Sequence, residues 1–147
     1  MESQVQKMLD QDVVRENNSP SSAPAILVPK RSLDGKPRYR FYVDFRALNS
    51  VTKLDSYPLP LIEETTSNLY GSRYFSLLDC YSGFRQVSIK EEHKERTAFT
   101  VPSGHYEFNR LPFGLSSSPA KFQRLMDTVL RSLVGSECWV FLDDVIY

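Results

Sequence analysis

The fold of this chain is decided by residues 138–147, which read CWVFLDDVIY. Two adjacent carboxylates, Asp143 and Asp144, lie here between two apolar runs. Neighbouring negative charges repel each other and resist removal from water unless a cation or an exposed turn compensates them. Two interpretations are therefore open. One is a β-hairpin whose two-residue turn is Asp-Asp, which is the commoner arrangement, and the other is a cation site.

A second strand-like run, residues 74–78, also ends in a carboxylate, Asp79. Acidic groups delivered from strand ends suit a pair of hard divalent cations, which prefer carboxylate oxygens. A sheet that brings Asp79 beside Asp143 and Asp144 would fit a two-metal nucleotidyl transferase. The expected order is a strand, a hairpin, a long helix and a strand-Asp-Asp-strand unit. This order predicts an α+β fold with a helix on one face of the sheet.

The composition is that of one globular domain. The chain has 147 residues, of which 41% are hydrophobic, so it can bury a core. Its 18 basic and 18 acidic side chains cancel, and net charge neither requires nor excludes a polyanionic partner. Residues 30–46 carry a local excess of positive charge, which suits either phosphate binding or a solvated strand surface.

Other site classes find little support in the sequence. Cys80 and Cys138 lie far apart without metal-ligand spacing, which argues against a zinc site. No apolar run approaches the roughly 20 residues of a membrane span, and the N-terminus has no signal-peptide core. We therefore expect a soluble protein inside a cell, with no membrane partner.

The apolar spacing predicts a series of short elements. In chain order we expect a helix at 2–16, a basic hairpin of 25–28 and 39–43 with its turn at 33–37, a short helix through Leu69, a strand ending at Asp79, a strand near 86–89, and a hairpin of 97–101 and 106–110. The strongest helix begins at Ser118, which can cap it, and has Pro119 at its first position. Its apolar stripe continues to Gly135.

Four short segments stand out by their order along the chain. They read RFYVDFRALN at 40–49, LDCYSGFRQ at 78–86, LPFGL at 111–115 and FLDD at 141–144. Together they resemble the ordered motifs of reverse transcriptases from gypsy-type long-terminal-repeat retrotransposons, over about residue 5 to the last residue. The resemblance implies reverse-transcriptase-like fingers and palm, with a ferredoxin-like palm sheet and a helix on one face. The implied division is fingers at about 1–57 and 86–112, and palm at about 58–85 and 113–147.

The resemblance also implies roles for single residues in template-directed addition of deoxynucleotides to a primer 3′-hydroxyl. Asp79, Asp143 and Asp144 match the carboxylates that hold two Mg²⁺ ions, with Mn²⁺ as an alternative. At neutral pH all three would be charged, as ligands of Mg²⁺ must be. Phe84 matches the aromatic steric gate under the sugar of the incoming nucleotide, and a packed core Phe is the alternative.

Further matches concern the triphosphate and the floor of the nucleotide pocket. Arg40, with either Lys30 or Arg31, matches the basic residues of the fingers hairpin that grip the triphosphate. The hairpin is longer here than in the usual family pattern, which leaves both Lys30 and Arg31 open. Phe113 and Gly114 would form the floor of the pocket. Gln86 and Arg124 are candidate contacts to the template or primer. The alternative is that both are simply exposed polar side chains.

The implied partners are an RNA or DNA template with its primer and deoxynucleoside triphosphates, in a cytoplasmic retroelement particle, with the oligomeric state open. In this family the chain continues past the Asp-Asp pair through a thumb and usually a ribonuclease H domain, whereas this sequence stops at Tyr147. The sequence thus predicts a partial RNA-directed DNA polymerase. Two alternatives are a catalytically inactive retroelement remnant and a nucleic-acid-binding module that uses the basic hairpin without catalysis.

Overall fold

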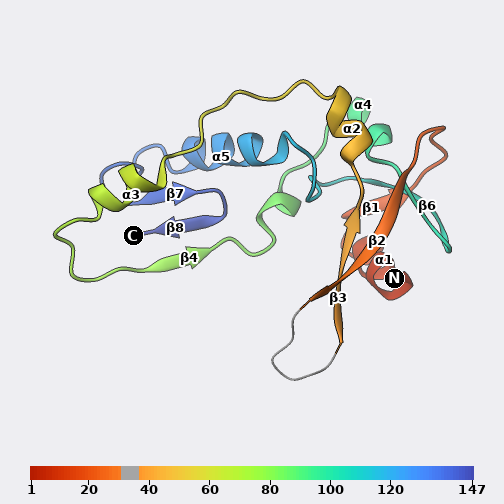
Figure 1. Ribbon diagram of the computed structural model, residues 1–147, viewed down its shortest axis with the longest axis horizontal. Helices are drawn as coiled ribbons and strands as arrows, with labels where there is room; N and C mark the ends of the chain where they lie inside the picture. Colours follow the sequence, from red (N-terminus) through yellow and green to blue (C-terminus); the bar gives the residue numbers. More distant parts are fainter. Residues whose placement is uncertain (31–36) are drawn as a thin grey trace. The chain divides into compact units, whose positions relative to one another are not determined.

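The computed structural model describes residues 1–30 and 37–147 and has the α+β architecture that the sequence predicts (Figure 1). Its elements, in chain order, are α1 (Glu2–Asp10), β1 (Val14–Glu16), β2 (Ala23–Lys30), β3 (Arg38–Val43), α2 (Arg46–Val51), α3 (Ile62–Asn68), β4 (Leu77–Asp79), the 3₁₀ turn η1 (Gly83–Gln86), α4 (Glu91–Lys94), the 3₁₀ turn η2 (Glu95–Thr97), β5 (Phe99–Val101), β6 (Gly104–Phe108), α5 (Ser118–Val129), β7 (Trp139–Phe141) and β8 (Asp144–Ile146). None of the helices in the described ranges is long and apolar enough to cross a membrane.

The chain divides into two compact units, each formed by two stretches of sequence. Unit 1 consists of Met1–Thr52 and Phe84–Ser116, and unit 2 consists of Lys53–Gly83 and Ser117–Tyr147. These borders lie within a few residues of the division into fingers and palm that the family resemblance implies.

Unit 1 is built on a five-stranded sheet with the strand order β1-β6-β5-β2-β3. β2 and β3 pair antiparallel from Ala25 opposite Val43 to Lys30 opposite Arg38, so the predicted basic hairpin is confirmed. Most of its predicted turn falls in 31–36, outside the described residues. The predicted hairpin of β5 and β6 is also confirmed, with Phe99 opposite Tyr106.

Aromatic packing fills the core of unit 1. Phe99 is fully buried, and its ring lies 5.1 Å from that of Phe108, 5.5 Å from that of Phe41 and 5.8 Å from that of Tyr106. Rings at these separations gain attraction beyond the burial of their area. Around them lie the other buried apolar residues of this core, Val5, Met8, Val13, Val14, Val43, Phe45 and Val101.

The predicted helix over residues 2–16 is wrong at its C-terminal end. α1 stops at Asp10, and Asp12 takes a left-handed conformation with φ +53° that reverses the chain. Asp is one of the few residues that visit this region at modest cost. The reversal lets Val14 pair with Phe108, so that β1 joins the sheet and adds Val14 to the core.

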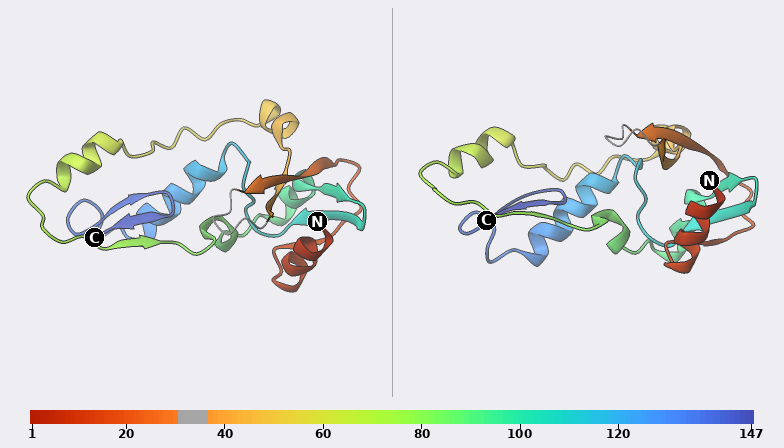
Figure 2. Two further views of the ribbon diagram at one scale, coloured as in Figure 1. Left: turned by 60° about the horizontal axis from the view of Figure 1, so that its bottom comes forward. Right: turned by 90° about the horizontal axis from the view of Figure 1, so that it is seen from below.

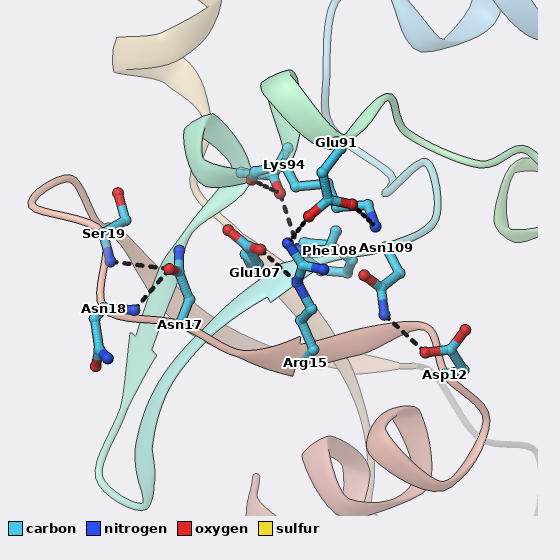
Figure 3. Close-up of polar contacts among 11 residues, drawn as sticks. Asp12, Arg15, Asn17, Asn18, Ser19, Glu91, Lys94, Glu107, Phe108 and Asn109 are labelled. Atoms are coloured by element: carbon cyan, nitrogen blue, oxygen red, sulfur yellow. Dashed lines mark hydrogen bonds and ion pairs between the residues drawn. The ribbon is translucent and has the colours of Figure 1, made fainter.

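An ionic cluster ties β1, β6 and α4 together within unit 1 (Figure 3). Arg15 lies between two carboxylates. Its Nε donates to Glu107 at 2.6 Å, and its Nη2 donates to Glu91. Glu91 is also paired with Lys94 at 2.7 Å. Glu107 is buried, and a buried carboxylate requires such a partner because charge removed from water is otherwise costly.

Unit 2 contains a three-stranded antiparallel sheet with the order β4-β8-β7 and the helix α5 on one face (Figure 2). Buried Cys138, Val140 and Val145 pack against half-buried apolar residues of the helix and of the turns that follow it. The predicted helix on one face of the sheet is thus confirmed. The predicted short helix before Leu69 is also present, as α3.

Three details of the predicted elements are wrong. The N-cap position of α5 is occupied by Ser117 and not by Ser118, and the helix ends at Val129 instead of continuing to Gly135. Beyond its end the Leu133 carbonyl accepts the N–H of Cys138 at 3.1 Å, because the chain must turn back to place Cys138 in the core. The strand expected near 86–89 is reduced to an isolated bridge, since η1 occupies its beginning.

Candidate active site

Strands β4 and β8 deliver two of the predicted carboxylates. They pair antiparallel, with Asp79 directly opposite Asp144. Opposed residues in such a pair have Cα atoms about 4.5 to 5.5 Å apart and side chains on the same face. The carbonyl oxygen of Asp143 accepts a hydrogen bond of 2.8 Å from the N–H of Cys80, the residue after Asp79. The backbone therefore brings Asp79, Asp143 and Asp144 to one edge of the sheet.

The hairpin between β7 and β8 turns at Leu142 and Asp143 and not at the Asp-Asp pair. Phe141 pairs with Asp144, which leaves a two-residue loop between them. Leu142 has φ +55°, and two-residue hairpin turns need a positive φ at their first position. This conformation is unfavourable for a residue with a Cβ atom. The Asp-Asp turn interpretation is therefore wrong, and Asp144 is the first residue of β8.

The three carboxylates all raise the pKa of one neighbouring thiol, that of Cys80. Burial raises the pKa of Cys80, and the negative charges of Asp143, Asp79 and Asp144 raise it further. A single sulfur that is affected by all three charges indicates that they lie around a common region. Asp79 and Asp144 are exposed and Asp143 is half-buried, so these carboxylates are open to solvent.

The donor chemistry of this edge fits a hard divalent cation, because all three side chains offer carboxylate oxygens. Within residues 1–30 and 37–147, no three His, Cys, Asp or Glu side chains are gathered closely enough to hold a metal ion. The backbone thus aligns the aspartates, while their oxygens are not closed around one point.

Gln123 of α5 also contacts this hairpin and was not predicted from the sequence. Its Oε1 accepts the N–H of Leu142 at 2.8 Å, and its Nε2 donates to the carbonyl of Val140 at 3.1 Å. The residue is fully buried. The only signal in the sequence is a polar residue within an otherwise apolar helical stripe. This signal is weak, because exposed polar residues also interrupt such stripes.

Phe84 and Phe113 meet within unit 1. Their ring centroids lie 5.1 Å apart with an interplanar angle of 75°, an edge-to-face contact. Phe84 is half-buried and Phe113 is 44% exposed. The pair therefore lies at the rim of unit 1, apart from the fully buried rings around Phe99.

Gly114 follows Phe113 and has φ +96°, a conformation that glycine adopts without strain. Asn49 holds this segment in place from α2. Its Nδ2 donates to the Gly114 carbonyl at 2.8 Å, and its Oδ1 accepts the N–H of Ser116 at 2.9 Å. Asn49 belongs to the first of the four sequence motifs, but its role in fixing the 114–116 segment was not predicted.

The basic residues of the hairpin are only partly described. Arg40 is exposed on β3 opposite Val28. Lys30 ends β2, whereas Arg31 lies outside the described residues. Arg46 is paired with Asp44 at 2.6 Å, and this contact lowers the pKa of the Asp44 carboxyl.

The candidate residues therefore form separate groups. The aspartates are together in unit 2, while Phe84, Phe113, Gly114 and Arg40 belong to unit 1. Arg124, a candidate nucleic-acid contact, is paired with Asp55 at 2.7 Å, and its guanidinium lies 4.7 Å from the centre of the Tyr57 ring.

Comparison with known proteins gives consistent matches. The family model described as "Reverse transcriptase (RNA-dependent DNA polymerase)" matches residues 28–147. The chain is 45% identical over 147 residues to the Retrovirus-related Pol polyprotein from transposon 297 of Drosophila melanogaster, covering 99% of this chain and 14% of that protein. It is 41% identical over 143 residues to the Enzymatic polyprotein of Cauliflower mosaic virus (strain NY8153), covering 97% of this chain and 21% of that protein.

A solved structure agrees with these relatives. The foamy viral protease-reverse transcriptase in complex with an RNA/DNA hybrid matches with a TM-score of 0.85 and 28% identity, over 97% of this chain and 18% of that chain. This chain thus spans a small part of the length of each of these proteins.

Proposed function

Because the chain belongs to the reverse transcriptase (RNA-dependent DNA polymerase) family, we propose that it is the fingers and palm part of an RNA-directed DNA polymerase from a retrotransposon Pol polyprotein. The fingers, at about 1–57 and 86–112, would correspond to most of unit 1, and the palm, at about 58–85 and 113–147, to most of unit 2. The observation that carries the proposal is the pairing of Asp79 with Asp144 across β4 and β8, with Asp143 bonded through its carbonyl to the residue after Asp79.

The proposed reaction is attack of a primer 3′-hydroxyl on the α-phosphate of a deoxynucleoside triphosphate, with release of pyrophosphate. Asp79, Asp143 and Asp144 would hold the divalent ions, Mg²⁺ or Mn²⁺. When bound, two such ions activate the hydroxyl and neutralise the triphosphate. The backbone pairing of β4 and β8 supports this role because it fixes the positions of the backbone atoms that carry Asp79 and Asp144.

The unit 1 residues would select and hold the nucleotide. The rigid ring of Phe84 would exclude a ribose 2′-hydroxyl, and its edge-to-face contact with Phe113 would restrict the movement of that ring. Arg40, together with Lys30 or Arg31, would neutralise charge on the triphosphate. Gly114 would let the backbone approach the nucleotide closely, since it has no side chain.

Nucleic-acid partners are proposed on the same basis. Structural relatives include the foamy viral protease-reverse transcriptase in complex with an RNA/DNA hybrid and with double-stranded DNA. We expect this chain to take a primed RNA or DNA template and to work within a longer polyprotein, in the cytoplasm of its host cell. The experiments below use an extended protein, defined as this chain continued after Tyr147 by the segment that follows the matching region of the transposon 297 polyprotein.

The test is primer extension by the extended protein on primed RNA with Mg²⁺ and deoxynucleotides. Asp79→Asn keeps the shape of the side chain but removes the charge that holds a hard cation. We expect extension to fall by about three orders of magnitude or more, since loss of such stabilisation costs several kcal/mol. Asp10→Asn is the matched control, because Asp10 is an exposed carboxylate of α1 that contacts only Gln6 among the described hydrogen bonds.

Extension by Asp79→Asn at the rate of the parent would rule out the proposed metal role. Retained binding of primed template with no extension in the parent protein would instead favour a nucleic-acid-binding module. A parent protein that neither binds nor extends would indicate an inactive remnant.

A further inference from the structure

Gln123 is a fully buried polar residue on the face of α5 that covers the sheet of unit 2. Burying an amide without hydrogen-bond partners is costly, so such a residue must be paired to be tolerated. The buried apolar residues of this unit's core are Cys138, Val140 and Val145, and Gln123 reaches the backbone carbonyl of Val140. The hydrogen bonds of Gln123 therefore decide what the residue does.

The amide of Gln123 is used at both ends. Its Oε1 accepts the N–H of Leu142 at 2.8 Å, while its Nε2 donates to the Val140 carbonyl at 3.1 Å and to Asp127 Oδ1 at 2.9 Å. The reversed amide would set an N–H group against the Leu142 N–H and an oxygen against two acceptors. The orientation is therefore fixed by its partners.

These bonds reach the backbone on both sides of Phe141, immediately before Asp143. Leu142 is held at φ +55°, a conformation that a leucine does not favour by itself. The Gln123 bond to its N–H compensates this cost from the helix side. From the strand side, the Asp143 carbonyl is held by the N–H of Cys80. The turn that carries Asp143 is thus held from α5 and from Cys80, the residue after β4.

A second layer of contacts orients Gln123 itself. Asp127, one helical turn further along α5, accepts the Gln123 Nε2 with one oxygen and the hydroxyl of Tyr57 with the other, at 2.7 Å. Tyr57 lies under the guanidinium of Arg124, which is paired with Asp55. The buried amide is therefore connected to a surface cluster of unit 2 through one carboxylate.

We propose that Gln123, oriented by Asp127, is a positioning residue that fixes the Leu142-Asp143 turn and thereby the Asp143 carboxylate for divalent cations. The inference rests on the proposed function, since it assigns Gln123 a role toward the same carboxylates. It goes further in naming as a determinant of metal affinity a helix residue whose amide oxygen is used for the Leu142 N–H and not for the metal. Residues that orient metal ligands typically change metal affinity ten- to a hundredfold when they are replaced.

A purely structural role would have a different signature. If Gln123 only filled space, Gln123→Met would preserve the volume, and any loss of stability would reduce the amount of active protein at every Mg²⁺ concentration. A positioning role predicts instead a higher half-saturating concentration of Mg²⁺, with unchanged affinity for primed template.

The experiment measures Mn²⁺ affinity by electron paramagnetic resonance and the Mg²⁺ dependence of extension, both in the extended protein. For Gln123→Met we expect the Mn²⁺ dissociation constant and the half-saturating Mg²⁺ concentration to rise about tenfold. Extension at saturating Mg²⁺ should recover most of the parent rate. Thr128→Val is the matched control, because Thr128 is on the same helix, is exposed, and donates its hydroxyl to the Arg124 carbonyl of the preceding turn.

Asp127→Ala serves as a second variant and decides the question if Gln123→Met fails to fold. It removes one of the two acceptors that orient the amide, so a rise of about threefold in the Mn²⁺ dissociation constant is expected. Unchanged Mn²⁺ affinity in the folded variants, with affinity lost in Asp79→Asn, would overturn the inference and leave the proposed function standing. Unchanged affinity in Asp79→Asn as well would overturn the proposed function.

Discussion

The two units differ in how much apolar surface they bury. In unit 1, the fully buried ring of Phe99 is surrounded by other aromatic rings and by buried aliphatic residues from α1 and from three of the five strands, β1, β3 and β5. In unit 2, the buried apolar cluster consists of Cys138, Val140 and Val145, and all three residues of β4 are exposed. The candidate metal site therefore lies in the unit with the smaller core, where side-chain hydrogen bonds must do more of the positioning.

The difference between the two cores can be tested by truncating one buried residue in each unit. Phe99→Ala should lower the free energy of opening of the β5 and β6 amides by about 3 to 5 kcal/mol, because a large buried ring is lost. Val145→Ala should lower the free energy of opening of the β7 and β8 amides by about 1.5 kcal/mol, since a smaller apolar side chain is removed. Native-state hydrogen exchange measures both values.

Equal losses at the two positions, or slower exchange in β8 than in β5 of the parent chain, would contradict the comparison. Ser22→Ala is a suitable control, because Ser22 is exposed and its hydroxyl contacts Thr100 at the surface of unit 1.

A second prediction separates nucleotide selection in unit 1 from chemistry in unit 2. Phe84→Val in the extended protein should raise ribonucleotide incorporation relative to deoxynucleotide by about tenfold or more, because the steric exclusion of a 2′-hydroxyl disappears with the ring. The ratio of the two kcat/KM values measures this. Phe113→Leu should have a smaller effect in the same direction, since it removes only the edge-to-face support of Phe84.

Phe75→Val is the matched control for this prediction, because Phe75 is a 54% exposed ring of unit 2. An unchanged ratio in Phe84→Val would mean that the ring is ordinary packing.

The smallest expected effect concerns the ionic cluster of unit 1. Lys94 and Arg15 lower the pKa of Glu91 below its ordinary value of 4.5. These ion pairs therefore stabilise the folded state above about pH 4.5, and their contribution is lost as the pH falls through the lowered pKa. Glu91→Gln should show a slightly lower thermal midpoint than the parent at neutral pH and the same midpoint in acid.

Glu16→Gln is the matched control, because Glu16 is an exposed carboxylate of β1, and it should leave the midpoint unchanged at both ends of the pH range. A Glu91→Gln variant with the same thermal midpoint as the parent at neutral pH would show that the cluster makes no measurable contribution to stability. Many exposed ion pairs make none.

Sequence patterns predicted the architecture where local signals were strong. The basic hairpin, the β5–β6 hairpin, α3 and the helix on the sheet of unit 2 follow from apolar spacing and from Pro and Gly positions. The motifs likewise named the three aspartates before any geometry was known. The pairing of Asp79 with Asp144 brings together residues that are far apart in the sequence, as an α+β sheet with this element order predicts.

The errors arise where long-range contacts override local preference. Val14 falls within the helix predicted over residues 2–16 but joins β1, because pairing with Phe108 buries it in the core. The Asp-Asp pair looks like a turn, yet Leu142 takes the first turn position because Gln123 and Cys80 hold the flanking backbone groups. Such a hydrogen bond between a helix side chain and a distant turn leaves no periodic trace in the sequence.

The most direct test of the central claim is the position of Mn²⁺ in crystals of the extended protein with primed template and a deoxynucleotide. Anomalous scattering locates the ions independently of the protein coordinates. We predict Mn²⁺ contacted by carboxylate oxygens of Asp79, Asp143 and Asp144, at about 2.0 to 2.3 Å as for other hard cations with oxygen ligands. Mn²⁺ bound elsewhere in a protein that extends primers, with these aspartates free of metal, would contradict the account.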